Sequence, residues 1–294
     1  MATELKPLAE HALGFEAPAL HLVGDEVAIG GIDVSGRKEQ FVVELWNWRS
    51  GLTERLTLPA TSVPAEIDSN AYARLSEKTM LVFVDYHSAY APLEQALLVL
   101  DRASGTWRTH AVYADHGFGE SLDDDVMAIG DASAISVIRI SDGAVLHQVP
   151  VSFRADAVAI NSERGHLAVV RDRKEVVLLR LDGSIAVRWP VERPWSLRFA
   201  PDDLAVWALS RSGIYLLQLD GVVHQVTNVP WQALDLERRR ALGAGNEVAQ
   251  LDLTTGERRV LGTLNAQPRG MPSFDVSNGR LAVAVDETVR VFQL

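Results

Sequence analysis

The densest group of potential metal ligands in the sequence lies between Tyr113 and Asp125. It holds His116, Glu120 and three consecutive aspartates, Asp123 to Asp125. Oxygen-rich clusters suit Ca²⁺ or Mg²⁺, but the spacing matches neither an EF-hand loop nor an HExxH helix. Three adjacent aspartates alternate faces on a strand, so they cannot all ligate one ion. We therefore expect a solvated loop and hairpin tip here, and we assign no metal or other cofactor.

A second set of polar residues recurs in one register, six positions ahead of a short apolar strand. The register holds His21, Asn161, Arg198, Asp235 and Asp275, with Asp68 and Asp123 at approximate equivalents. If these strands surround a common axis, the side chains form a polar ring that lines a channel. The alternative is that they are hydrogen-bonded between neighbouring sheets, as most buried polar groups are.

Aromatic residues form a third group with a functional interpretation. Trp195 and Trp231 each follow a proline directly, at matching places of adjacent repeats. If exposed, they would form an aromatic lip suited to a peptide or a sugar ring, because large rigid side chains dominate interface energetics. The alternative is that they pack in the core. Further candidates for the same face are Tyr86, His87, Tyr90, His116, Phe118, Phe153 and Trp189.

No enzyme motif accompanies these residues. The sequence contains no GxSxG elbow, no P-loop, no GxGxxG turn opening a helix and no CxxC pair. The run Arg238 to Arg240 lies at a predicted tip, where we expect a solvated turn rather than a phosphate site. We therefore assign no catalytic residue.

The elements that must position these residues are apolar strands that each end in a polar turn containing glycine. The turn glycines stand at positions 51, 105, 143, 183, 221 and 256, so successive turns are 35 to 54 residues apart. Glycine supplies the positive φ that a hairpin turn requires, so each pattern predicts two antiparallel strands. Periods of about 40 to 45 residues are typical of four-stranded propeller blades.

Short apolar strands upstream of the hairpins give an independent count of seven. They begin at Val27, Leu81, Met127, Leu167, Leu204, Ala241 and Leu281. The last one leads into the segment 288–294, which leaves the seventh blade one strand short. We expect the segment 5–13 to supply this outer strand and so to remove the open edge of the ring.

The sequence therefore predicts an all-β fold, a single seven-bladed β-propeller of four-stranded antiparallel blades. Residues 1–14 give the outer strand of the last blade, and the blades cover roughly 15–60, 61–114, 115–152, 153–191, 192–228, 229–264 and 265–294. Residues 69–78 and 88–95 are predicted to be insertions into the second blade, the first with a helical turn. The alternative of two smaller barrels or a sandwich array would need a linker, and we find no low-complexity break.

Two segments resemble WD40 repeats. Residues 45–51, Leu-Trp-Asn-Trp-Arg-Ser-Gly, are similar to the end of a WD40 third strand, and residues 197–203 to its innermost strand and tip. The Gly-His pair occurs only at Gly165-His166, before a different strand, and Trp-Asp is absent. The chain thus resembles the wider WD40-like and YVTN-like propeller superfamily. This resemblance implies a non-enzymatic scaffold that recognises a protein or peptide, although fold alone does not fix function.

The sequence is also compatible with a second functional class, an enzyme or a small-ligand binder. Propeller enzymes of the lactonase type hold a metal at the channel with carboxylate and Asn side chains, so the polar ring could serve an enzyme or a small-ligand binder. Composition narrows the partners further: a net charge of −11 argues against nucleic acid, which needs a basic face. With no cysteine, no signal peptide and no long apolar stretch, we expect a cytoplasmic monomer that does not bind a membrane.

Overall fold

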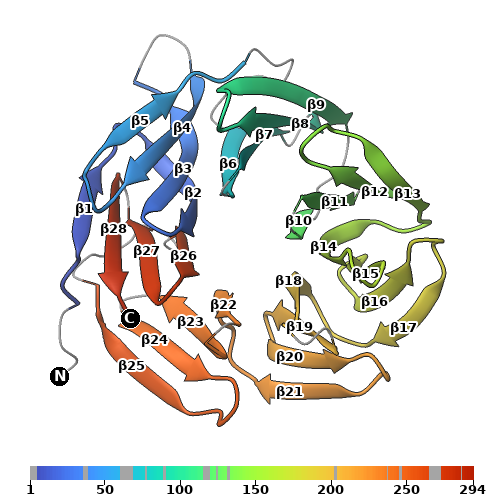
Figure 1. Ribbon diagram of the computed structural model, residues 1–294. Helices are drawn as coiled ribbons and strands as arrows, with labels where there is room; N and C mark the ends of the chain where they lie inside the picture. Colours follow the sequence, from blue (N-terminus) through green and yellow to red (C-terminus); the bar gives the residue numbers. More distant parts are fainter. Residues whose placement is uncertain are drawn as a thin grey trace.

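The computed structural model describes residues 5–35, 39–59, 69–76, 78–88, 91–114, 120–123, 125–130, 133–201, 204–236, 238–244, 247–264, 273–285 and 287–294. They form seven four-stranded antiparallel sheets around a central opening (Figure 1). The chain is therefore a seven-bladed β-propeller, which confirms the predicted fold class. Within these ranges no helix is long and apolar enough to span a membrane.

Each blade is a meander that begins with the strand next to the central opening and runs outwards. Blade 1 consists of β2 (Glu16–Val23), β3 (Glu26–Asp33), β4 (Gln40–Asn47) and β5 (Thr53–Leu56). Blade 2 consists of β6 (Ser69–Leu75), β7 (Thr79–Ser88), β8 (Ala91–Asp101) and β9 (Thr106–Ala114). Blade 3 consists of β10 (Glu120–Asp123), β11 (Val126–Gly130), β12 (Ala134–Arg139) and β13 (Val145–Pro150).

The next three blades follow the same plan. Blade 4 consists of β14 (Ala155–Asn161), β15 (His166–Arg171), β16 (Glu175–Arg180) and β17 (Ile185–Trp189). Blade 5 consists of β18 (Pro194–Phe199), β19 (Ala205–Ser210), β20 (Gly213–Gln218) and β21 (Val223–Thr227). Blade 6 consists of β22 (Ala233–Asp235), β23 (Arg240–Ala244), β24 (Glu247–Asp252) and β25 (Arg258–Thr263).

Blade 7 combines both ends of the chain. It consists of β26 (Ser273–Ser277), β27 (Arg280–Val285), β28 (Thr288–Gln293) and, as its outer strand, β1 (Ala9–Ala12). In the antiparallel register Ala9 faces Val291 and Ala12 faces Thr288. The predicted closure of the ring by the N-terminal segment is confirmed.

The turn glycines are required by their backbone conformation. All six have positive φ, from 67° at Gly105 to 98° at Gly221. A neighbouring aspartate completes several of these turns, as where Oδ1 of Asp252 accepts hydrogen bonds of 2.8 Å from the N–H groups of Thr254 and Thr255. These backbone hydrogen bonds lower the pKa of Asp252.

The core lies between the blades, which explains why the second strands are apolar throughout instead of alternating. Along β15, Leu167 and Val169 pack in a cluster shared with blade 3. Ala168 and Val170 pack in a cluster shared with blade 5. Both faces of each sheet are covered by a neighbour, so both sets of side chains are buried and contribute hydrophobic stabilisation.

The expectation for residues 69–78 was wrong. Instead of an insertion with a helical turn, Ser69–Leu75 is β6, the innermost strand of blade 2. Its Ala71, Ala73 and Leu75 are buried at every second position, the period of a strand. Alanine favours helix in isolation, but pairing with β7 and burial decide the conformation. The second predicted insertion, 88–95, lies where the long strands β7 and β8 meet.

Candidate functional site

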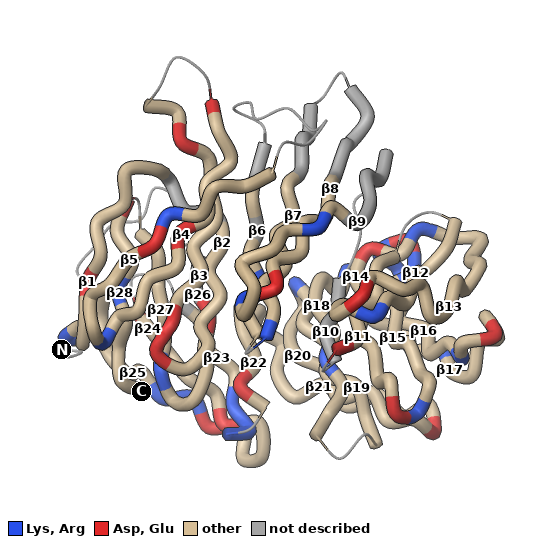
Figure 2. Tube along the Cα trace, turned by 45° about the horizontal axis from the view of Figure 1, so that its top comes forward, with Lys and Arg blue, Asp and Glu red and all other residues tan. Residues whose placement is uncertain are grey.

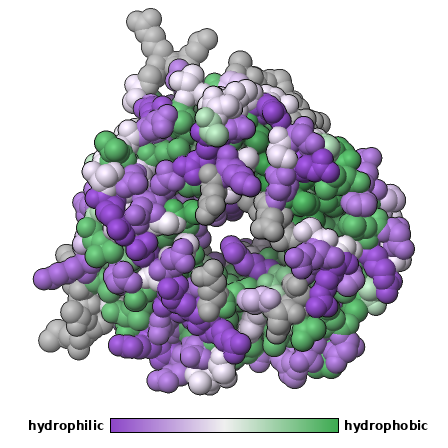
Figure 3. All heavy atoms as spheres, in the orientation of Figure 1, coloured by the Kyte–Doolittle hydropathy of each residue, from purple (hydrophilic) through white to green (hydrophobic). Residues whose placement is uncertain are grey.

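The polar register identified in the sequence converges on the centre of one propeller face, which we call the mouth face because the innermost strands end there. A cavity of about 620 Å³ occupies this position. Its lining includes His21, Asn161, Arg198, Asp235 and Asp275. Of the two approximate equivalents, Asp68 and the Asp123 side chain lie outside the described residues. Figure 3 shows the molecule hollowed at its centre, with hydrophilic residues around the opening.

His21 connects three blades at the wall of this channel. Its Nδ1 accepts a hydrogen bond of 2.9 Å from the backbone N–H of Leu75 in blade 2. Its Nε2 lies 4.0 Å from Oδ2 of Asp275 in blade 7, and that oxygen accepts a 2.8 Å hydrogen bond from the N–H of Leu22. The two side chains thus satisfy backbone groups of neighbouring blades, which matches the hydrogen-bonded alternative for the ring.

The charge state of His21 follows from these contacts. Burial lowers the pKa of His21 to about 4; Asp275 opposes the shift, whereas the positive charges of Arg74 and Arg198 reinforce it. Because Nδ1 accepts a hydrogen bond, the single ring proton lies on Nε2, directed to the Asp275 side. The ring is neutral at pH 7, so the positive charge at this wall comes from the arginines.

Asp235 and Asn161 also accept hydrogen bonds from residues close to them in the chain. The Asp235 carboxylate accepts a 2.9 Å hydrogen bond from Nε of Arg240 and lies 2.9 Å from its Nη2. Asn161 Oδ1 accepts a hydrogen bond of 2.9 Å from the N–H of Arg164. The prediction of a solvated turn at 238–240 is therefore wrong for Arg240, whose side chain is only 12% exposed because it pairs with Asp235.

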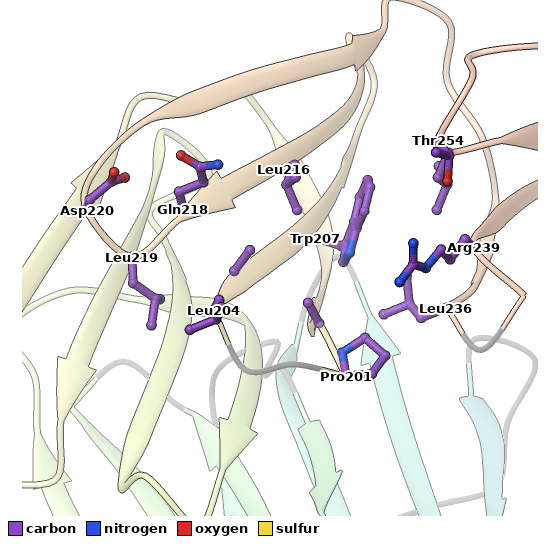
Figure 4. Close-up of a pocket in the computed structure, with 13 residues that line it drawn as sticks. Pro201, Leu204, Trp207, Leu216, Gln218, Leu219, Asp220, Leu236, Arg239 and Thr254 are labelled. Atoms are coloured by element: carbon purple, nitrogen blue, oxygen red, sulfur yellow. The ribbon is translucent and has the colours of Figure 1, made fainter.

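A groove opens from the channel between blades 5 and 6, with a volume of about 860 Å³. It shares Ala200, Pro201 and Leu236 with the lining of the channel, so the two spaces adjoin. Most of its walls are apolar; the lining includes Leu204, Trp207, Leu216, Leu219, Leu236 and Leu253 (Figure 4). Polar groups stand at its border, from Gln218, Asp220, Arg239 and Thr254.

The groove includes exposed apolar surface. Leu204 is 59% exposed, an unusual state for a leucine beside an apolar cavity. In Figure 4 the rings and chains of Trp207 and Leu216 lie on one wall, and Arg239 extends from the other wall towards them. The sequence did not identify three residues as part of the site: Trp207 and Leu204 in the groove, and Arg74 in the lining of the channel. The one local signal was an apolar residue, Leu204, directly after the polar tip 201–203.

The two candidate tryptophans have different environments. Trp195 is 45% exposed on the face opposite the mouth face, at the start of β18. Trp231 is only 4% exposed and packs with Leu209, Ile214 and Leu234 in the core between blades 5 and 6. The two tryptophans therefore do not form the aromatic lip described above, because the Trp231 ring is buried.

The remaining aromatic candidates are mostly committed to packing or lie outside the described residues. Trp189 is fully buried, and its Nε1 donates a 2.9 Å hydrogen bond to the carbonyl of Gln218. Phe153 lies under the guanidinium of Arg171, 5.3 Å from it. Tyr90, His116 and Phe118 lie outside the described residues, as do the side chains of Tyr86 and His87.

No group of three or more metal-ligating side chains gathers in the described ranges, which leave out part of the predicted cluster around residue 116. At the channel itself, the carboxylates of Asp235 and Asp275 already accept the hydrogen bonds described above. What the site offers chemically is a polar, hydrogen-bonding channel, lined by Arg74 and Arg198 as well as by Glu163, Asp235 and Asp275, next to an apolar groove.

Comparison with known proteins supports the fold but does not indicate a function. No family model and no curated protein sequence matches the chain. Among solved structures, a chain of the "Crystal Structure of Mitotic Checkpoint Complex" matches with a TM-score of 0.69 and 13% sequence identity, covering 99% of this chain and 96% of that one. The likeness supports the overall fold. Because 830 chains of solved structures match significantly, the fold does not select one function.

Proposed function

We propose that the chain is a non-enzymatic binding scaffold that recognises a protein or peptide partner through the mouth face. The observation that carries this proposal is the apolar groove between blades 5 and 6 that runs into the polar channel. Peptide-binding grooves commonly combine an apolar pocket, which gives affinity, with polar groups at its border, which give orientation.

Two further points support a binding role. The solved structure with a similar fold is described as a complex, and propellers present large, rigid faces built from loops. The surface also holds an exposed leucine at the groove, Leu204, where a buried partner residue would gain hydrophobic contact. We place the protein in the cytoplasm as a monomer, as the composition predicts.

Selection from a random peptide library on the purified protein tests the proposal. Selected peptides should bind the wild-type chain and lose at least about tenfold in affinity with Leu204→Asp, since the new carboxylate would have to be desolvated in the groove. The matched control is Leu52→Asp, which changes another exposed leucine, in the turn between β4 and β5 of blade 1. Calorimetry of each peptide with the three proteins gives the affinities.

The same experiment separates the two faces. Peptides that tolerate Leu204→Asp but lose affinity with Trp195→Ala would move the site to the opposite face. A library that yields no binder for either face would contradict the scaffold.

The second candidate function is a small-ligand or enzyme site in the channel, favoured by the cavity that His21 and Arg198 both line. Elemental analysis of the purified protein is the direct measurement. A stoichiometric, tightly bound cation would place this function ahead of the scaffold.

A further inference from the structure

We infer that the groove selects an extended peptide carrying one acidic residue a few positions from a large apolar residue. The carboxylate would meet Arg198 at the channel, and the apolar side chain would lie on Trp207 and Leu216. This inference rests on the proposed function and specifies the chemistry of the partner.

One row of cross-strand neighbours sets the order of these contacts. Arg198 in β18 is paired with Trp207 in β19, and Trp207 is paired with Leu216 in β20. Directly opposed residues of antiparallel strands lie on the same face of a sheet. The row therefore runs outwards from the channel on the side of blade 5 that faces blade 6, with the cation first and the apolar side chains after it.

The cation at the inner end is available to a ligand. Arg198 is exposed and forms no hydrogen bond or ion pair with the part of the chain that the structure describes. The buried carboxylate of the cavity lining, Asp235, is already paired with Arg240. Arg239, exposed on the opposite wall, adds a second positive charge beside Trp207 (Figure 4).

The outer end of the groove has the opposite charge. Asp220 lies in the turn between β20 and β21, where its Oδ1 accepts a hydrogen bond from the N–H of Val222. Along the row, Arg198 thus lies at the channel end and Asp220 at the outer turn, which favours an acidic peptide residue at the channel end. Figure 2 shows acidic and basic residues interspersed over the blades, so this local order is not a feature of the whole surface.

The length of the row limits the spacing in the peptide. Adjacent strands are about 4.8 Å apart, so β18 and β20 are separated by about 10 Å. An extended chain advances about 3.3 Å per residue, so two to four residues cover this distance. The net charge of −11 repels an acidic run at long range, which favours one acidic residue over several.

The test repeats the library selection on wild-type protein and on Arg198→Glu, with Arg211→Glu as the matched control. Arg211 is an exposed arginine of the same blade, in the turn between β19 and β20 on the opposite face. Wild type and Arg211→Glu should enrich Asp or Glu two to four residues from a large apolar residue. Arg198→Glu should enrich Lys or Arg at that position and keep the apolar residue.

Affinities of individual peptides give the second readout. Changing the acidic residue to its amide should weaken binding to wild type by about twofold to fivefold, the range for an exposed ion pair, and should not weaken binding to Arg198→Gln. Light scattering with and without peptide shows whether a second copy of the chain occupies the groove instead.

The outcomes distinguish this inference from the proposed function. Peptides that need Leu204 but show no charge preference, or the same preference with Arg198→Glu, would overturn the inference and leave the scaffold in place. A dimer that Leu204→Asp dissociates would overturn the inference, since the occupant would be a second copy. A library without binders would overturn both.

Discussion

Nε2 of His11 lies 3.2 Å from Oε2 of Glu44, and the imidazole stacks on Trp46 with 5.3 Å between ring centroids. His11 belongs to β1, the outer strand of blade 7, whereas Glu44 and Trp46 belong to β4 of blade 1. The contact therefore bridges the seam where the ring closes. Glu44 is 9% exposed, so its carboxylate depends on this partner for hydrogen bonding.

Replacing His11 by alanine should lower the free energy of unfolding by about 1–3 kcal/mol, because a buried carboxylate loses its partner. Glu10→Ala is the control on the same strand: its side chain is 51% exposed and pairs with Arg290 at 2.7 Å. An exposed pair of this kind contributes less than about 1 kcal/mol. Urea unfolding measures both, and equal losses would contradict a specific role for the seam contact.

Gly213→Ala should prevent folding or destabilise the protein severely. An added Cβ would stand 1.7 Å from the carbonyl oxygen of Thr227, on a backbone with φ of 131°. The control is Gly256→Ala, where φ is 73° and no atom lies within 4 Å of the added Cβ. That variant should cost only about 1 kcal/mol from the backbone conformation. Similar melting temperatures for the two variants would show that β20 and β21 are not packed as described.

Stability should fall as the pH is lowered from 6.5 to about 4 through His21. Its folded pKa is about 4 and the ordinary value is 6.5, so in this window the unfolded chain binds a proton that the folded chain does not. Above pH 6.5 the group has no effect. A shift of this size corresponds to about 2–3 kcal/mol for a side chain that keeps some solvent contact.

The variant His21→Asn isolates this effect, since the amide oxygen can accept the Leu75 hydrogen bond and does not titrate. The carboxylates that contribute less to stability at low pH are the same in both proteins, so their contribution cancels in the difference between the two free energies of unfolding. Urea unfolding at pH 7, 5.5 and 4.5 should show wild type losing more stability than the variant. Parallel curves would mean that His21 is not buried in its neutral form.

The two tryptophans that follow proline should differ sharply in their effect on stability. Trp231→Ala empties a core site and should cost about 3–5 kcal/mol. Trp195→Ala removes a ring that is 45% exposed and should change stability by less than about 1 kcal/mol. Thermal unfolding of both variants is the measurement. A large loss for Trp195→Ala would show that its ring is packed.

The architecture could be predicted because its signals are local. A hairpin turn with positive φ needs glycine, so the turns at Gly143 and Gly183 are visible in the sequence itself. Strands covered on both faces, such as β15, are continuous apolar runs. β6 was missed because Ala71 and Ala73 suit a helix equally well, and only pairing with β7 selects the strand.

The candidate site could be predicted only in part. A fixed register along the innermost strands placed His21, Arg198 and Asp275 on one cavity, because equivalent positions of a ring converge on its axis. Trp195 and Trp231 share the same local sequence, yet Trp231 packs inward against Gly243, where a ring carbon lies 3.3 Å from an added Cβ. The groove depends on the distance between blades 5 and 6, which no single repeat encodes.

The seam of the ring also has a kinetic consequence. Glu10 and Arg290, which meet across β1 and β28, are 280 residues apart in the chain, so blade 7 can be completed only after the rest of the propeller has been synthesised. Non-local pairing of this kind slows folding because the chain must close a long loop first. Until then β1 has no partner. Its four residues, Ala-Glu-His-Ala, carry little apolar surface, which limits mispairing with other strand edges during that delay.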